Sequence, residues 1–458
     1  MSTRASDAAA VVGATMLILL PLLVNGFPLV YSDTGTYLRS AFEGFVPTDR
    51  PYWYGGFIRI TSLNGVWITG TTVTQSLLCA IYLFLLIRTA LNGRAARITL
   101  LVFCSIAGVF SGLGWYAGQL MPDIFTPIGA MAMYLLVAGE GRWPARAAHV
   151  AVVALCAWSH SSNLLILPLV GLAAISAVAG RSMAAWRRPL ARWALATVCA
   201  WGGLYTANGL LEGDPYLSKG NHVFLMGRLA ETGMLEPLLR AECPQRDWRI
   251  CQHVDSLPRT ARAFIWDDKS PLHHMGGWDS TRAEYGEIVR VSFGTPERLW
   301  HHAAASATST AEQLSAWRIG EEIESHWYRE PWSAPAMAIA RVLPGSLPAF
   351  NGAMQQGGRG ELSLSWPDAG YRLLLATSLL VVAVHLVRRR RPAHPAVSGI
   401  VVLAMAATII DAWVCASLSE VLARYLARAS WLLLLAATVV VARWKTVPGA
   451  ASADRSRR

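Results

Sequence analysis

The feature that most constrains this chain is a series of about ten long apolar runs separated by short polar segments. These runs lie near 8–31, 67–91, 98–114, 123–139, 147–159, 163–180, 192–211, 371–387, 396–418 and 428–443. Runs of about 17 to 25 apolar residues are long enough to cross a bilayer as helices. Only 15% of the residues are charged, well below the roughly 25% of a soluble domain. The sequence therefore predicts an all-α polytopic membrane protein with about ten transmembrane helices.

The basic residues indicate how these helices are oriented. They fall in short clusters such as "NGRAAR", "GRWPARAAH", "RRRRPAH" and the C-terminal tail. An even number of helices places all these clusters on one side, which the positive-inside tendency identifies as the cytoplasm. We therefore expect a multi-pass protein of the bacterial inner (plasma) membrane with both termini cytoplasmic. The net charge of +11 is explained by these clusters, so nucleic-acid binding is disfavoured.

Segment 212–367 differs from the rest of the chain. It is rich in charge, holds eight of the nineteen tryptophans, and has no run long enough to cross a membrane. At this length it is large enough to bury a core, and its spacing is helical. We expect a mainly helical periplasmic domain inserted between helices 7 and 8. The N-terminal transmembrane region with catalytic external loops then covers 1–211, and the C-terminal helices with the cytoplasmic tail cover 368–458.

Cysteine usage agrees with this assignment of sides. Five of the seven cysteines lie in apolar runs, where cysteine behaves as a small hydrophobic residue. Cys243 and Cys251 lie in the inserted segment, in "ECPQRDWRIC". An oxidising compartment would allow these two thiols to form a disulfide.

The first outward loop contains the most informative polar residue. Asp33 follows the first apolar run directly and lies among Ser32, Thr34, Gly35 and Thr36. A carboxylate beside hydrocarbon is costly unless it is hydrated, paired or functional. The alternative is that Asp33 caps the helix that "SDTGTYLRSAFEG" would begin. The residues alone leave both interpretations open.

Further candidates follow in the outward loops. In "PTDRPYWYGGFIR", Arg50 and Arg59 could hold an anionic headgroup, while Tyr54 and its aromatic neighbours suit the interface. Asp123 in "GQLMPDIFTP" is a second outward acid, and it could equally cap the helix that follows. His160 in "WSHSSNLL" lies in a polar interruption between two apolar runs.

That interruption also contains Asn163, and a late outward segment, "SEVLARYLARASWLLLL", contains Arg424 and Tyr425. An arginine there could bind a phosphate at the interface, or its guanidinium group could simply extend to water. Asn163 and its neighbours either break a helix or contact a ligand.

Three of these segments together resemble the GT-C superfamily of multi-span glycosyltransferases. "YSDTGTY" resembles the first-loop motif of that family, "MPDIFTPI" its second-loop acid, and "ARYLARASWLL" its late arginine–tyrosine motif. The resemblance covers the membrane helices and their loops but not segment 212–367. Many relatives carry two adjacent acids in the first loop, whereas Asp33 stands alone.

The resemblance implies an inverting glycosyltransferase that contributes to cell-envelope glycans. It would move a sugar from a polyprenyl-phosphate donor in the membrane lipid to a glycan, lipid or protein acceptor. Asp33 would be the catalytic base, and Asp123 would orient the acceptor or hold a divalent cation (Mg or Mn) together with Asp33. Arg424, with Arg50 or Arg59, would bind the donor phosphate. The expected substrate-contacting residues are Tyr37, Tyr54, His160, Asn163 and Tyr425.

Two other classes of protein remain open. An O-antigen ligase or polymerase would share the many helices and the large external loop, but would depend on external arginines and a histidine. A lipid or sugar transporter would favour several acids within the helices, paired discontinuous helices and no large one-sided domain. Of the acids, we expect only Asp411 and Glu420 to lie deep in a span.

Overall fold

The computed structural model describes residues 3–139, 141–178, 183–320, 323–324, 326–388 and 394–446. The described part is all-helical, and its extended pairing is limited to one isolated bridge between Leu29 and Gln119. Parts of two predicted basic clusters, at 389–393 and from 447 onwards, lie outside the described residues.

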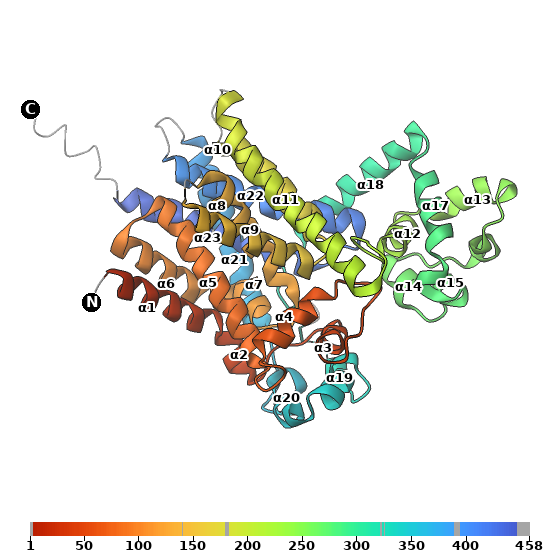
Figure 1. Ribbon diagram of the computed structural model, residues 1–458, viewed down its shortest axis with the longest axis horizontal. Helices are drawn as coiled ribbons and strands as arrows, with labels where there is room; N and C mark the ends of the chain where they lie inside the picture. The colour runs from red at the N-terminus through yellow and green to blue at the C-terminus, as the bar shows by residue number, and fades with distance from the viewer. Residues whose placement is uncertain are drawn as a thin grey trace, which may run out of the picture.

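Eleven α-helices precede the inserted segment. They are α1 (Thr3–Ile18), α2 (Leu20–Asn25), α3 (Thr34–Glu43), α4 (Trp53–Thr61), α5 (Thr69–Ala90), α6 (Gly93–Phe110), α7 (Gly112–Ala117), α8 (Phe125–Ala138), α9 (Trp143–Ser159), α10 (Asn163–Val178) and α11 (Met183–Glu212). The last three helices among the described residues are long: α21 (Ser365–Val387), α22 (Pro395–Leu418) and α23 (Ala423–Thr446). Together these helices form the main body in Figure 1.

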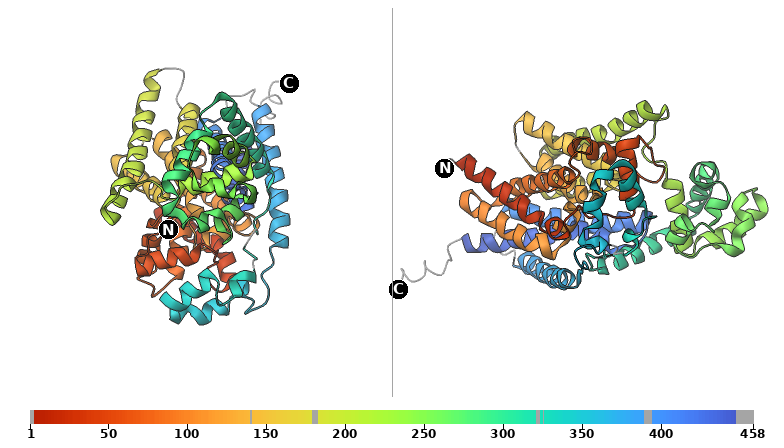
Figure 2. Two further views of the ribbon diagram at one scale, coloured as in Figure 1. Left: turned by 90° about the vertical axis from the view of Figure 1, so that its right-hand side faces the viewer. Right: turned by 90° about the horizontal axis from the view of Figure 1, so that it is seen from below.

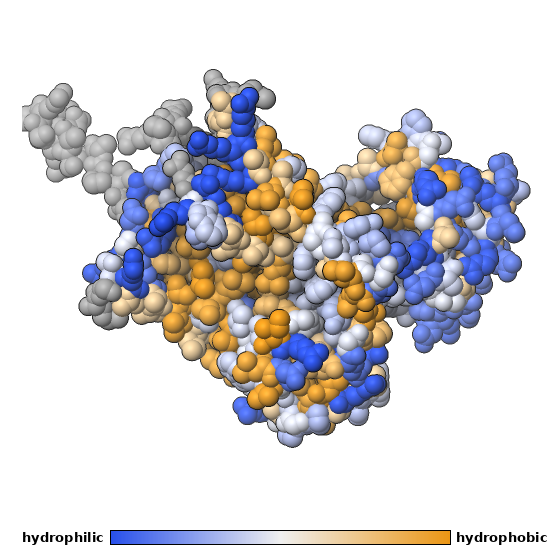
Figure 3. Space-filling model, viewed as in Figure 1, coloured by the Kyte–Doolittle hydropathy of each residue, from blue (hydrophilic) through white to orange (hydrophobic). Residues whose placement is uncertain are grey.

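Five of the described helices are long and apolar enough to cross a membrane. They are α5, α6, α21, α22 and α23, and shorter apolar helices cover Pro122–Ala138 and Asn163–Ala177. On α21, Leu373 and Leu380 are 66% and 64% exposed. A helix this apolar with so much outward-facing leucine needs an apolar solvent around it. Figure 3 shows the resulting hydrophobic surface over the main body. These features indicate a helical membrane protein.

The first predicted helix, 8–31, is broken in the structure. Helix α1 ends at Ile18, α2 begins at Leu20, and α2 ends where Gly26 adopts a φ of +83°. Pro21 supplies no backbone N–H and sits at the start of α2, which explains why the helix restarts there. Residues 26–33 therefore form an irregular segment rather than the end of a helix. This break shapes the loop that contains Asp33.

The inserted segment contributes to two separate cores. Its first part consists of α12 (Asn221–Glu231), α13 (Leu235–Glu242), α14 (Ala261–Trp266), α15 (Pro271–His274), α16 (Gly277–Ser280) and α17 (Arg282–Ser292). These helices enclose their own hydrophobic cluster, including Met226, Leu239, Phe264 and Ile288. We call residues 221–292 the lobe, and it projects from the body in Figures 1 and 2.

The second part of the inserted segment belongs to the main body. Helix α18 (Pro296–Ser315) packs on α22, and α19 (Ala334–Val342) packs on α3. Ile319, Tyr328 and Phe350, the last from α20 (Leu347–Asn351), join the hydrophobic core of the membrane helices. Only the lobe therefore has a core of its own within segment 212–367.

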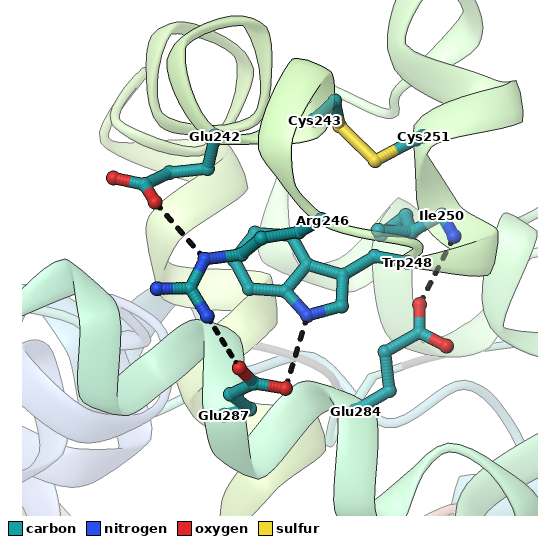
Figure 4. Close-up of a disulfide and its surroundings, with 8 residues drawn as sticks. All are labelled: Glu242, Cys243, Arg246, Trp248, Ile250, Cys251, Glu284 and Glu287. Atoms are coloured by element: carbon teal, nitrogen blue, oxygen red, sulfur yellow. Dashed lines mark hydrogen bonds and ion pairs between the residues drawn. A yellow bond between two sulfur atoms is a disulfide. The ribbon is translucent and has the colours of Figure 1, made fainter.

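A disulfide joins Cys243 to Cys251 in the lobe, with the two Cα atoms 5.8 Å apart. Figure 4 shows the short loop that it closes. Within this loop Arg246 pairs with Glu242 and Glu287, and the indole of Trp248 donates a hydrogen bond to Glu287. The loop is thus fixed to α17 by polar contacts as well as by its own cross-link.

Candidate functional site

A cavity of about 910 Å³ lies between the body and the lobe. The segments before and after α3, the α9–α10 junction, the connection between α22 and α23, and the lobe all contribute to its walls. Six of the predicted site residues line it: Asp33, Tyr37, Arg50, His160, Arg424 and Tyr425. Residues from four distant parts of the sequence therefore line one cavity, whose walls are partly polar and partly apolar.

The loop before Asp33 is held in place by its backbone. Leu29 exchanges backbone hydrogen bonds with Gly118 and Leu120, at 2.9 and 2.8 Å. The Gln355 side chain accepts from Val30 N–H and donates to Val30 C=O, both at 2.9 Å. Because the Gln355 amide pairs with Val30 as a neighbouring strand would, the broken end of the first helix is fixed without regular structure.

Asp33 itself lies between two arginines. Its Oδ1 is 2.7 Å from Nη1 of Arg50, and its Oδ2 is 4.0 Å from Nη2 of Arg424. Asp33 precedes α3, but its side chain forms no capping hydrogen bond with that helix. The helix-cap interpretation is therefore not supported by the geometry, and the carboxylate faces the cavity instead.

The arginines control the ionisation of Asp33. Burial alone would raise the pKa of this carboxyl, but the guanidinium groups of Arg50 and Arg424 outweigh that effect and lower it below the ordinary value. Ser32 Oγ donates a further hydrogen bond to Oδ1 at 3.2 Å. Asp33 is consequently a carboxylate at neutral pH and an acceptor of hydrogen bonds.

The guanidinium group of Arg424 is held in a position that suits binding of an anion. It is the second residue of α23, its guanidinium carbon lies 4.2 Å from the ring centre of Tyr31 and 4.9 Å from that of Tyr425, and Nη2 donates to the Tyr425 hydroxyl. The side chain is 11% exposed. Its buried Nε has no hydrogen-bond partner among the described residues. A buried guanidinium with an unused donor at a cavity wall favours an anionic ligand.

One turn further along α23 lies Arg428, which the sequence analysis did not select. Its fully buried guanidinium is 2.6 Å from Oδ1 of Asp411 and 3.2 Å from Oδ1 of Asp123. It also donates to Ser162 Oγ at 3.2 Å and Cys415 Sγ at 3.1 Å. Arg428 on α23 therefore contacts α22, the turn before α8 and the connection between α9 and α10 through one buried cation. The sequence signal was its position four residues after Arg424, on the same helix face.

The second predicted acid, Asp123, has a different setting from the one expected. It lies in a single 3₁₀ turn (Pro122–Ile124), is fully buried, and pairs with Arg428. It is not among the residues that line the cavity. Its Oδ2 has no hydrogen-bond partner among the described residues. Asp123 thus lies behind the cavity wall, next to Arg428, rather than facing a substrate directly.

His160 lines the cavity, and both of its ring nitrogens have donors beside them within the fold. An arginine can only donate, and Arg428 Nη1 lies 3.0 Å from His160 Nε2. Nδ1 lies 3.3 Å from the Ser162 backbone N–H, which can also only donate, and 2.9 Å from Ser162 Oγ. Burial and the Arg428 cation lower the pKa of His160 to about 3. In this arrangement His160 has no free lone pair with which to act as a base.

Three of the predicted site residues lie away from the cavity. Arg59 is exposed and bonds to Asn64 at 3.1 Å, because α4 carries it away from the first loop. Tyr54 is fully buried and its hydroxyl donates to Gln75 at 2.7 Å. Asn163 is likewise buried, and its amide donates to the Cys156 carbonyl at 2.9 Å. All three have polar partners within the fold and none of them lines the cavity.

The donor set does not suit the divalent cation that Asp33 and Asp123 were expected to share. Asp33 faces the cavity and is paired with Arg50, whereas Asp123 is paired with Arg428 behind the wall. No group of three or more His, Cys, Asp or Glu side chains with metal-binding geometry occurs among the described residues. Each carboxylate has a guanidinium group on one of its oxygens, where a shared cation would also need to bind.

The fold and the site together define a helical membrane protein with an arginine-lined cavity beside a projecting lobe. The chain matches no protein-family model, and no curated protein and no solved structure is significantly similar to it.

Proposed function

We propose that this protein is an inverting glycosyltransferase of the GT-C type. It would transfer a sugar from a polyprenyl-phosphate donor to an acceptor hydroxyl on the periplasmic side of the bacterial inner membrane. The observation that carries the proposal is the contact of one cavity-facing carboxylate, Asp33, with two arginines, Arg50 and Arg424. A base for the acceptor and cations for the leaving phosphate are thus side by side in a cavity large enough for both substrates.

The proposed topology follows the predicted one, with about ten spans. The five long apolar helices would cross the membrane fully. The shorter apolar helices α8 and α10, together with α1 and α2, α9 and α11, would complete the set. The lobe and the cavity would then lie at the periplasmic face, where the phosphate of a lipid-linked donor is found.

In the proposed reaction Asp33 accepts the proton of the acceptor hydroxyl. The hydroxyl oxygen forms a bond to the anomeric carbon as the bond from that carbon to the phosphate oxygen breaks. Because the arginines lower the pKa of Asp33, the proton moves late, once bond formation has made the hydroxyl acidic. The leaving phosphate departs with the bonding electrons, and inversion follows from attack on the face opposite to it.

Arg424 and Arg50 stabilise the leaving group. The phosphate gains a negative charge when the glycosidic bond breaks, and preorganised cations lower the free energy of that change. Arg424 is the stronger candidate because its Nε has no partner among the described residues. Its guanidinium also contacts the rings of Tyr31 and Tyr425.

The experiment that tests this proposal uses the purified protein with a panel of polyprenyl-phosphate sugars, and follows the release of polyprenyl phosphate. Asp33→Asn keeps the shape of the side chain but cannot accept the proton, so the rate should fall about 10²–10⁴-fold while donor binding is kept. Asp255→Asn, at an 89% exposed side chain of the lobe, is the control and should retain full activity. Near-normal transfer by Asp33→Asn would remove the catalytic assignment.

One observation favours a second candidate, an O-antigen ligase or polymerase. His160 lines the same cavity as Arg50 and Arg424, and that class would depend on arginines and a histidine. Here both ring nitrogens of His160 have partners within the fold, which disfavours it as a base. If His160→Gln abolishes transfer while Asp33→Asn does not, this second candidate is preferred.

A further inference from the structure

The lobe supplies an exposed tryptophan to the cavity. Trp266 is the last residue of α14, lines the cavity, and is 45% exposed. Trp278 packs against it, with its ring centre 5.7 Å from that of Trp266 and 45° between the planes. Phe224 from α12 packs on Trp278 at 5.5 Å. The exposed indole therefore belongs to a cluster of three aromatic side chains.

The surroundings of Trp266 are too polar for a lipid chain. Asp267, Asp268 and Lys269 follow it directly and are exposed. Insertion of this turn into hydrocarbon would bury three charges. An aromatic residue at this position therefore has to be explained by something other than contact with the bilayer.

Two polar side chains line the cavity beside the lobe. Ser218 and Asn221 both contribute to the wall, and neither side chain forms a hydrogen bond within the described part of the chain. They offer a hydroxyl and an amide to a ligand. A flat apolar surface together with hydroxyl and amide groups in the same cavity matches a sugar ring, which has one apolar C–H face and a rim of hydroxyls.

An ion pair connects this part of the lobe to the catalytic end of the cavity. Arg262, one turn before Trp266, lies 3.7 Å from Glu420, which is in the short connection between α22 and α23. Both residues line the cavity, as do Trp266 and Asp33. The arginine and carboxylate groups of the body and the tryptophan of the lobe therefore line the same cavity.

We propose that the acceptor is a carbohydrate and that Trp266 binds it by stacking on one of its sugar rings. This inference rests on the proposed transferase function and adds the class of acceptor to it. The stacked ring would lie across Trp266, with Ser218 and Asn221 bonding to its hydroxyls. Its reacting hydroxyl would point toward Asp33. The lobe would then determine which acceptor is used, whereas the membrane body would bind the donor.

The test is a binding measurement that needs no donor and no turnover. The full-length protein is titrated with a set of neutral and uronic-acid-containing oligosaccharides, and binding is followed by tryptophan fluorescence and by calorimetry. The wild type should bind at least one member, and Trp266→Ala should weaken that binding at least about tenfold, as the loss of an aromatic anchor does. Trp266→Phe should recover part of it, because a ring remains at the position.

The matched control is Trp300→Ala, since Trp300 is a 71% exposed tryptophan on α18 that does not line the cavity. It should bind as the wild type does. If no oligosaccharide binds the wild type, or if Trp266→Ala binds as tightly as Trp300→Ala, the acceptor site is overturned. Failure of the transferase proposal gives a different result, in which sugar binding at Trp266 is present but no donor is consumed.

Discussion

Removal of the buried Arg428 cation provides a direct test of the network behind the cavity. In Arg428→Met the side chain keeps a similar length but loses every donor. Asp411 would keep a single contact, from Cys415 Sγ at 3.5 Å. Asp123 would keep none, since Arg428 supplies the one hydrogen bond its side chain makes among the described residues. Breaking a buried ion pair from one side costs about 3–5 kcal/mol because a buried charge is left without a partner.

The measurement is thermal unfolding of the purified protein in detergent, followed by tryptophan fluorescence. Arg428→Met should unfold several degrees below the wild type. Adding Asp411→Asn to it should restore part of the loss, because that change removes one of the two stranded charges. Arg59→Met is the control, and as an exposed arginine it should change stability by less than about 0.5 kcal/mol. An Arg428→Met protein that unfolds with the wild type would refute this account of the network.

Three further predictions follow from the site, the lobe and the topology. Because the arginines lower the pKa of Asp33, the transfer rate should fall on acidification only below the usual aspartate pKa of about 3.9. Arg50→Ala should shift this fall in rate to higher pH, and an unchanged pH dependence would contradict the pairing of Arg50 with Asp33. Reduction of the lobe disulfide should speed limited proteolysis of residues 221–292, because closing a loop of this length is worth about 2.5 kcal/mol; equal cleavage rates before and after reduction would argue against that. Reporters fused at position 94 should read as cytoplasmic and those at position 250 as periplasmic, and a cytoplasmic reading at 250 would reverse the proposed side of the site.

Much of the helical layout is readable from the sequence because apolar length is a strong signal. Helices α5 and α22 lie within two residues of the predicted runs 67–91 and 396–418. The first run was harder, since apolar composition continues through Pro21 and Gly26 while the backbone changes direction. Hydropathy indicates whether a segment prefers an apolar or an aqueous environment. It does not indicate where a proline or a left-handed glycine ends a helix.

Some residues of the site can be identified from a local sequence pattern, whereas others depend on contacts between distant parts of the chain. Asp33, Arg50 and Arg424 stand out because polar residues at the ends of apolar runs are costly unless they are used. Arg428 is the first residue of the predicted apolar run 428–443, so its charge was counted as part of a membrane span. Its role depends on Asp123 and Asp411, at 305 and 17 residues' distance along the chain. No local pattern contains a pairing of that kind.

The sharing of arginines between Asp33 and the expected phosphate has a consequence for the proposed reaction. A polyprenyl-phosphate sugar carries one negative charge on its phosphate, and the released polyprenyl phosphate carries up to two. During transfer Asp33 takes up a proton and loses its charge, so one negative charge moves from the carboxylate to the phosphate. Arg424 lies 4.0 Å from the carboxylate and has an unused Nε donor. It can therefore interact with the charge at both ends of this movement.

As Asp33 becomes neutral, Arg50 and Arg424 interact less strongly with it and more strongly with the leaving group. Stabilisation that increases along the reaction coordinate lowers the barrier, whereas equal stabilisation of both states would not. In this scheme the pairing that weakens Asp33 as a base in the resting protein also favours the transition state.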